Sequence, residues 1–523
     1  MKKVTRILAV VLALCMGLAL AACGGGSADT GNAESGGSGE AQAAPVSKDL
    51  VVGTPISTQG FDPATSNNGI GLNLVYERLF RLDPATGEVK GALAESWEWL
   101  DDAHSQLKIK IREGATFSNG SPVTAEDVLF SLKYYLEAGS NLATYFNNYD
   151  YDNSEILDEK TLVLHYINPT GSALNLLCLG EIQCKAYYEE KGADAFWDAP
   201  VGSGAYTCSE NVSGDHATYV RRSDYDGTMP EAETITVRSY AEPSTMFIDF
   251  ENGDLDAAFD LEITDTDRAV ADTSGAYTVT LQPDYDTNMF VLSDNVDEFK
   301  SDLVRQAIAL GVDWQAVAEA SYGQNLCTLA TSILPEGMKY KINVGTYEYN
   351  PEKAKELMKE AGYENGFDIL LIGMSDPAGE RMAVTIQGYL AALNINMTTE
   401  FDELTVAVVK LMKGESNCMV KSIPGGATAQ DPDQVLDLMK KTSTNLSCRV
   451  NNDEFDGYIM GGLYAIDEEV RADQYAKAQQ WAYDNCWVIP VCDTYTSYVT
   501  KTGIELKTNS GSYPDLTLVH YAE

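Results

Sequence analysis

The chain has 523 residues, and its 78 acidic residues outnumber 36 basic ones, which gives a formal net charge of −42 at pH 7. A surface this acidic repels phosphate backbones, so the composition argues against a nucleic-acid-binding protein. At roughly 150 residues per domain, the length predicts about three domain-sized units.

The chain begins with a short positive and apolar segment. Lys2, Lys3 and Arg6 precede an apolar run over 7–22. At about 16 residues, this run is too short to span a membrane comfortably and is typical of an export signal. We therefore expect residues 1–22 to be a signal peptide.

The apolar run ends at a single cysteine. Leu20, Ala21 and Ala22 precede Cys23, and this L-A-A-C resembles the lipobox of bacterial lipoproteins. The resemblance implies cleavage before Cys23, acylation of its sulfur, and a protein anchored on the outer side of the bacterial cell membrane without spanning it. Ordinary cleavage that leaves Cys23 a free thiol is the alternative. Residues 23–47 are rich in Gly, Ser, Ala and Glu and have no aromatic residue, so they predict a flexible linker after the cysteine.

Beyond the linker, four short segments have the apolar or alternating pattern of β-strands. They are Leu50–Gly53, Leu107–Ile111, Thr161–Ile167 and Thr234–Tyr240.

Three further segments carry helix signals. Apolar residues over 73–80 recur at helical spacing. Thr124 is expected to cap a helix, with an acidic residue at its third position. Asn350 and Pro351 are expected to begin another helix that ends at Gly362. Together with the strands, these helices place the chain in the mixed α and β class (α/β, mixed α+β).

The residue types that mark common enzyme sites are scattered or missing. The four histidines are far apart in the sequence, with no H-E-x-x-H, and there is no G-x-x-x-x-G-K-[ST] and no G-x-S-x-G. We therefore expect no metal site, no cofactor and no enzymatic activity. A surface-anchored hydrolase that uses an acidic pair is the alternative of another class.

Cysteine usage gives little support to metal or redox chemistry. Of ten cysteines, Cys15 lies in the signal and Cys23 at its end, and no C-x-x-C occurs. The remaining eight are expected to be buried thiols or to form a few disulfides. Cys486 and Cys492 flank an apolar segment, and if it is an extended strand they lie about 20 Å apart, too far to pair.

Six longer blocks follow one another along the chain. They are VYERLFRLDPATGEVKGALAESWEW (75–99), IKIREGATFSNGSPVTAEDV (109–128), PVGSGAYT with RRSDYDG (200–227), DLVRQAIALGVDWQAV (302–317), AKELMKEAGYENGF (354–367) and RADQYAKAQQWAYDNCWVIPV (471–491). In this order they resemble the family 5 extracellular solute-binding proteins, the peptide, dipeptide and nickel receptors of ATP-binding-cassette (ABC) importers. Ala205 and Ser223 stand where the family usually has Pro and Asn.

The resemblance implies a two-lobed clamshell of the periplasmic-binding-protein type with an extra inserted domain. Lobe I would comprise 48–81, 203–290 and 491–523, the inserted domain 82–202, and lobe II 291–490. The ligand would lie in the cleft between the lobes.

The same resemblance implies the function. It predicts a monomeric receptor that captures a small solute, in the first place a di- or oligopeptide, and delivers it to an ABC permease and its ATPase. A nickel chelate or an oligosaccharide is the alternative ligand. A lipoprotein sensor or scaffold with the same fold is the alternative role.

The segment expected to bind the ligand departs from the family's pattern. Peptide-binding members have a Trp and an Asp ahead of a D-P-D-like turn, and this Asp pairs with the peptide's α-ammonium. Here the turn is Asp431-Pro432-Asp433, and Thr428 stands three residues before it. A threonine hydroxyl cannot neutralise a buried ammonium. Either the anchor is Asp431 or Asp433, or the ligand has no free amine; alternatively, the turn only caps a helix that begins near Gln434.

Other candidate ligand residues are weaker. Gly425 and Gly426 would leave backbone exposed for a ligand's main chain. Tyr145 lies where the family's inserted domain approaches the cleft, and Asn288 lies near the expected crossing between lobes, although a core or turn role is the alternative for both. Arg305 resembles the arginine of the family's V-R-Q-A block, and we interpret it as structural.

Overall fold

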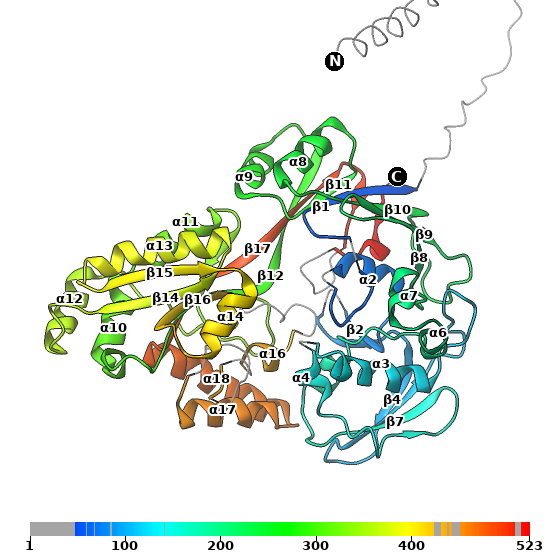
Figure 1. Cartoon of the computed structure of the whole chain (residues 1–523), viewed down its shortest axis with the longest axis horizontal. Helices are drawn as coiled ribbons and strands as arrows, with labels where there is room; N and C mark the ends of the chain where they lie inside the picture. The colour runs from blue at the N-terminus through cyan, green and yellow to red at the C-terminus, as the bar shows by residue number, and fades with distance from the viewer. Residues whose placement is uncertain are drawn as a thin grey trace, which may run out of the picture. The chain divides into compact units, whose positions relative to one another are not determined.

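The central element of the computed structural model is an eleven-stranded sheet that draws strands from both ends of the chain. The structure describes residues 48–522, apart from 59, 67, 84–85, 141, 423–429, 437–438, 442–449 and 508–513. The sheet has the strand order β15-β14-β16-β12-β17-β11-β1-β10-β9-β8, with β13 also paired to β17 (Figure 1). Its helices and strands alternate along the chain, which confirms the predicted mixed α and β class.

Two long strands join the halves of this sheet. β12 (Tyr277–Leu292) and β17 (Val488–Lys501) are antiparallel neighbours over most of their length. β17 pairs with β11 (Ala257–Phe259) at one end, and β12 pairs with β16 (Cys418–Ser422) at the other. The chain therefore crosses between the halves twice, along these two strands (Figure 1).

The first half of the sheet is built around β1 (Asp49–Thr54), a strand that the sequence predicts. β1 is parallel to both β10 and β11, while β9 and β8 continue the sheet in antiparallel fashion. Leu50 and Val52 point into the core and are fully buried. The other elements of this half are α2 (Gly69–Val75), β8 (Tyr206–Val212), β9 (His216–Arg221), β10 (Thr234–Ser239), α8 (Pro243–Asn252), α9 (Ile263–Ala271), β18 (Ile504–Glu505), η2 (Leu516–Leu518) and β19 (His520–Tyr521).

The helix predicted over 73–80 is wrong from Tyr76 onward. α2 ends at Val75, and Tyr76 is extended, with φ −112° and ψ 154°. Phe80 begins β2 (Phe80–Leu82), which pairs with β3 (Val89–Gly91). The strand pairing with β3, and not the helical spacing of the apolar residues, therefore decides the conformation at Phe80.

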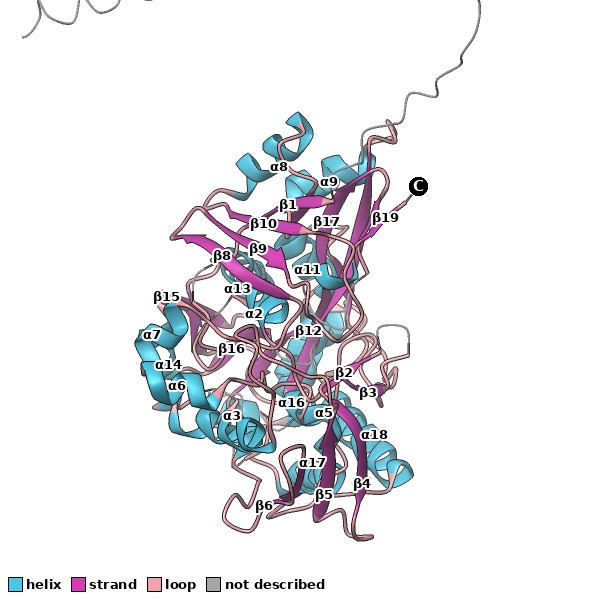
Figure 2. Ribbon diagram, turned by 90° about the vertical axis from the view of Figure 1, so that its right-hand side faces the viewer, coloured by secondary structure: helices cyan, strands magenta, loops and turns pink. Residues whose placement is uncertain are grey.

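A separate four-stranded sheet lies within residues 82–202. Its order is β4-β5-β7-β6; β4, β5 and β6 are labelled at the bottom of Figure 2. The helix α3 (Ala125–Glu137) follows β5 in the chain. Thr124 and Asp127 form the predicted capping box at the start of α3, with Thr124 N–H donating to the Asp127 carboxylate at 2.8 Å. The other elements are β4 (Ala94–Trp99), β5 (Gln106–Ile111), α4 (Ala143–Phe146), β6 (Glu155–Ile156), β7 (Thr161–His165), α5 (Ala173–Leu176), α6 (Lys185–Lys191) and α7 (Ala193–Asp198).

Two arginines, Arg112 and Arg222, fix the 82–202 segment to the first half of the large sheet. The Arg112 guanidinium pairs with Glu77 at 2.8 Å and with Asp226 at 2.7 Å. The Arg222 side chain is almost wholly buried and donates to the Thr116 carbonyl at 3.1 Å. Because these residues belong to the first three sequence blocks, those blocks encode the junction between the two parts.

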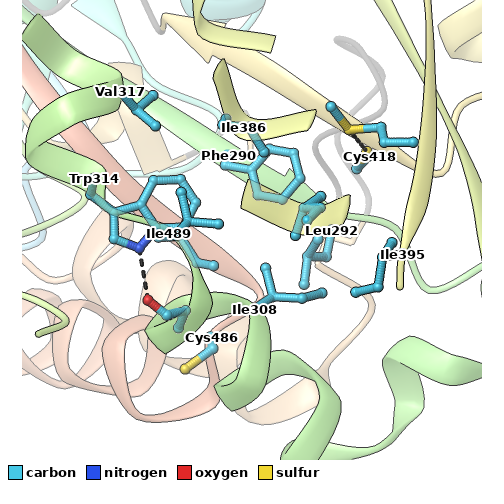
Figure 3. Packing of buried hydrophobic residues seen from close by; sticks show 14 of the residues in the cluster. Phe290, Leu292, Ile308, Trp314, Val317, Ile386, Ile395, Cys418, Cys486 and Ile489 are labelled. Carbon is cyan, nitrogen blue, oxygen red and sulfur yellow. Dashed lines mark hydrogen bonds between the residues drawn. The ribbon is translucent and has the colours of Figure 1, made fainter. Parts of the chain in front are cut away.

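The second half of the sheet continues from β12 through β16 to β14 and β15, which are parallel to each other. Its core is shown in Figure 3, where Phe290, Leu292 and Ile386 pack beside Trp314, whose indole N–H donates to the Ala309 carbonyl at 2.8 Å. The elements are η1 (Glu298–Lys300), α10 (Asp302–Gly311), α11 (Trp314–Tyr322), β13 (Cys327–Leu329), α12 (Pro351–Glu360), β14 (Asp368–Met374), α13 (Pro377–Ala391), β15 (Asn396–Asp402), α14 (Leu404–Met412), α16 (Asp433–Leu436), α17 (Asp453–Leu463) and α18 (Glu468–Asn485).

Local signals in this half agree with the sequence. The Asn350 side chain caps α12 by accepting from Lys353 N–H at 3.0 Å, and Pro351 is the first helical residue. The Arg305 guanidinium, 2% exposed, donates to the Phe299 carbonyl at 2.6 Å, which confirms its structural role.

All seven cysteines within the described residues are free thiols, and Cys448 lies outside them. Cys486 corrects one expectation, because it adopts a left-handed conformation at the end of α18 and the extended strand begins only at Val488.

Candidate functional site

The strand β12 is interrupted where it crosses between the halves of the sheet. Its register with β17 shifts between Pro283 and Thr287, which leaves residues 284–286 as a bulge. Tyr285 at the centre of the bulge has φ 58°, a conformation that a bulky side chain rarely adopts. Bulges and strained residues concentrate at binding sites because they redirect side chains. The crossing is therefore a candidate binding site.

The bulge contacts residues of the second half of the chain. The Gln430 side chain lies close enough to Tyr285 to lower the pKa of its hydroxyl, against the larger, raising effect of burial, and Gln430 also has a positive φ of 49°. A Cβ atom on Gly337 would lie 3.0 Å from the Tyr285 ring, so glycine permits this close approach. The half-buried Asp284 carboxylate accepts a hydrogen bond from Thr496 on β17.

Asn288 lies just beyond the bulge, where it is 4% exposed. Its side-chain oxygen accepts from the Tyr322 hydroxyl at 3.0 Å, and its side-chain nitrogen has no partner among the described residues. The neighbouring Thr287 hydroxyl donates to Asp493 at 2.7 Å. Burial raises the pKa of Asp493 to about 6, although the hydrogen bond from Thr287 and the charge of Lys341 oppose this.

A buried charge cluster lies at the D-P-D turn. Arg471 of α18, 1% exposed, pairs with both oxygens of Asp431 at 3.1 and 2.8 Å and with Asp433 at 3.2 Å. The Tyr475 hydroxyl donates to Asp433 as well. Burial and, after it, the charge of Asp431 raise the pKa of Asp433 to about 7. One guanidinium thus serves two buried carboxylates.

Asp431 also accepts from Asp433 N–H at 3.1 Å, at the start of α16. The interpretation of this turn as a helix start therefore agrees with the structure, with the helix beginning at Asp433 instead of near Gln434.

Two cavities flank the charge cluster. The first, about 260 Å³, is lined by Tyr145, Asn147, Asn148, Asn168, Thr170, Leu176, Asp433, Lys440, Leu463 and Tyr464. The second, about 600 Å³, has Trp99, stacked on His104, in one wall, and Gln430 and Arg471 in the opposite wall. Both cavities are walled by the 82–202 segment on one side and by the 291–490 segment on the other.

The structure brings some of the predicted site residues together and separates others. Tyr145 and Asp433 line the same cavity, and Asp431 lies beside it in the charge cluster. Asn288 lies apart from them, at the crossing. The remaining predicted residues, Gly425, Gly426, Thr428 and Cys23, lie outside the described residues.

Three residues of this region were missed by the sequence analysis. Tyr285, Gln430 and Arg471 carry no local motif, because their significance comes from contacts across the two halves of the chain. Only the position of Arg471 at the start of the sixth block could have drawn attention to it.

The described residues contain neither a cluster of metal-binding side chains nor a membrane-spanning helix. In the part of the chain that the structure describes, no three His, Cys, Asp or Glu side chains are grouped so that they could hold a metal ion. Among the described helices, none has the length and apolar composition that crossing a membrane requires.

Comparisons with known proteins agree with this architecture. Heme-binding protein A of Haemophilus influenzae is 26% identical over 473 residues, covering 83% of this chain and 84% of that protein. The dipeptide-binding protein of Escherichia coli is 26% identical over 487 residues, with coverages of 84% and 88%.

Solved structures of other proteins have a fold similar to that of this chain. NikA from Brucella suis in complex with Fe(III)-EDTA superposes with a TM-score of 0.81 at 21% identity, over 90% of this chain and 99% of that one. The periplasmic binding protein DppA from Helicobacter pylori, in complex with the peptide STSA, has a TM-score of 0.75 at 20% identity, over 91% and 98% of the chains. The fold is thus the two-lobed, periplasmic-binding-protein-like clamshell that the sequence resemblance implies.

The family description that matches covers most of the chain. The pattern of "Bacterial extracellular solute-binding proteins, family 5 Middle" matches residues 88–447, a range that includes the bulge, the D-P-D turn and four complete sequence blocks. The chain belongs to the bacterial extracellular solute-binding proteins of family 5.

Proposed function

We propose that the protein is the ligand receptor of an ABC importer and that its ligand is a di- or oligopeptide. The observation that carries the proposal is the contact of the Tyr285 bulge with Gln430, which joins the crossing strand to the segment just before the D-P-D turn. Relatives named for dipeptide, glutathione and heme binding support the solute class.

The lobes of this receptor follow the division implied by the sequence. Lobe I would comprise 48–81, 203–290 and 491–523, lobe II 291–490, and 82–202 the inserted domain. A ligand that touches both lobes binds the closed state better than the open one, and a shift from 1:99 to 99:1 needs about 5.5 kcal/mol of differential affinity. Hydrogen bonds from both walls of the cleft can supply that difference.

The charge cluster at the D-P-D turn bears on how the receptor treats a peptide's α-ammonium. Asp431 and Asp433 already share Arg471, so neither is free to pair with an ammonium as the family's Asp does, and Thr428 carries no charge. We therefore expect the receptor to tolerate peptides whose amine is blocked. Parallel titrations with a peptide and its N-acetylated form test this, and a loss of about a hundredfold or more on acetylation would show that a carboxylate partner exists.

The N-terminal segment would fix the location of the receptor. We propose that residues 1–22 direct export, that lipid on Cys23 anchors the protein to the cell membrane, and that 23–47 tether a monomeric receptor beside its permease. Labelled palmitate should be incorporated by the full chain and not by a Cys23→Ala variant. Equal incorporation by both would contradict the anchor.

Thermal unfolding with peptide libraries tests the receptor function. A ligand at a hundredfold excess over its dissociation constant stabilises the folded protein by about 2.7 kcal/mol. The ligand should be recovered unchanged, because we propose binding without catalysis, whereas a hydrolase would release products. Folded protein that no peptide, chelate or oligosaccharide stabilises would contradict the function.

A further inference from the structure

The turn between β7 and α5 touches the 291–490 segment with three consecutive residues. The Thr170 hydroxyl donates to the Leu463 carbonyl at the end of α17 at 2.8 Å. The Ser172 hydroxyl lies 2.9 Å from the Thr170 hydroxyl, and the Ser172 side chain lies close enough to Asp433 to lower the pKa of that carboxyl, against the larger effect of burial. Thr170 is 3% exposed and Ser172 is fully buried, so water is excluded from this contact.

Gly171, between them, shows how closely the two segments approach. A Cβ atom added to Gly171 would lie 2.5 Å from Cδ of Arg471 and 2.6 Å from the backbone carbonyl oxygen of Ala465. Real Cβ atoms do not tolerate such distances, and a backbone oxygen cannot move aside as a flexible side chain can. The contact therefore needs glycine for reasons of space, and any larger residue has to separate the segments.

This contact lies where it can affect how far apart the two lobes are. Residues 82–202 are fixed to the first half of the sheet by Arg112 and Arg222, so they move with it as one body. Leu463, Ala465 and Arg471 belong to the other lobe. The turn thus joins the lobes at a place outside the crossing strands β12 and β17, with a cavity on each side of it.

We propose that the Thr170–Gly171–Ser172 turn is a clasp that holds the two lobes closed through contacts of the protein alone. The clasp goes beyond the proposed receptor function, since it acts in the ligand-free chain and does not depend on what the ligand is. It sets the fraction of closed protein before binding, and apparent affinity scales with that fraction.

A matched pair of glycine variants tests the clasp in the ligand-free protein. Gly171→Ala adds a methyl group where there is no room, whereas Gly388→Ala adds one on α13 where no atom outside the neighbouring backbone of that helix lies within 4 Å. Hydrogen exchange of peptides covering 165–176 and 459–471 reports both sides of the contact, and small-angle X-ray scattering reports the radius of gyration.

We expect Gly171→Ala to speed exchange on both sides by about fivefold or more, the factor that one lost buried hydrogen bond supports, and to increase the radius of gyration. Gly388→Ala should change neither quantity. Exchange and scattering of Gly171→Ala that match the wild type would overturn the clasp. If Gly171→Ala does not fold, Thr170→Val is the second test, because it removes the hydrogen bond to Leu463 without adding volume. Unchanged hydrogen exchange of Thr170→Val at 459–471 would refute the proposal.

Discussion

Replacing Arg471 with Met should strongly destabilise the protein, because it leaves two buried carboxylates facing each other. Asp431 is fully buried and Asp433 is 3% exposed, and both rely on this guanidinium for their positive partner. Methionine fills most of the same space, so the cost is electrostatic. Removing one partner of a buried ion pair typically costs about 3–5 kcal/mol.

The loss of stability caused by Arg471→Met can be measured as a change in the midpoint of thermal unfolding. In a unit of 150–250 residues, 1 kcal/mol corresponds to about 2–4 °C, so Arg471→Met should lower the midpoint by about 6–20 °C. Arg268→Met is the matched control, because Arg268 is half-exposed in its ion pairs with Glu251 and Asp265 and should contribute about 1 kcal/mol or less.

A further variant separates repulsion from lost attraction. When Asp431 and Asp433 are both changed to Asn in the Arg471→Met background, much of the stability should return, since no charge is then left buried. The reasoning is refuted if Arg471→Met unfolds within about 2 °C of the wild type, or if the neutral combination is no more stable than Arg471→Met alone.

Three other substitutions have defined outcomes. Asp433→Asn tests a pH dependence. The pKa of Asp433 is about 7 in the folded protein and near 4 in the unfolded chain, so between these values the folded protein binds more protons than the unfolded chain. The free energy of unfolding of the wild type should therefore rise as pH falls from 8 to 5. In urea titrations at each pH, Asp433→Asn should flatten the slope of the unfolding free energy against pH. An unchanged slope would mean that other groups cause the pH dependence. Thr124→Ala, which removes the capping box of α3, should cost about 1 kcal/mol in the same assay, with Ser118→Ala, outside any helix, as the neutral comparison. Phe290→Ala should cost about 3–5 kcal/mol because the ring is fully buried in the core of Figure 3, and a loss under 1 kcal/mol would mean that this core repacks.

The sequence predicts those elements whose signals are local. The capping box at Thr124, the Asn350 cap and the strand around Leu50 are all found where they are expected, because each depends on residues within one or two turns. The fold class and family follow from block order, since Arg112, Arg222 and their partners must come together to join the 82–202 segment to the sheet.

Features made by distant contacts could not be predicted in the same way. Phe80 leaves the helical pattern because it pairs with Gly91. Arg471 is buried against Asp431 and Asp433, which lie 40 and 38 residues earlier in the chain and balance its charge. Tyr285 has its positive φ at a place where Gln430 and Gly337, distant in the sequence, lie beside it. The sequence analysis gave Asp431 and Asp433 as candidate ligand residues, and in the structure both carboxylates pair with the protein's own Arg471.

The most direct test of the receptor is native mass spectrometry of the soluble chain, beginning after Cys23, mixed with di- and tripeptides and then denatured. Our account predicts one solute bound per chain, with the same solute released unchanged on denaturation. Folded protein that retains no solute from these mixtures, or that returns shortened peptides, would contradict the claim that this clamshell captures peptides for import.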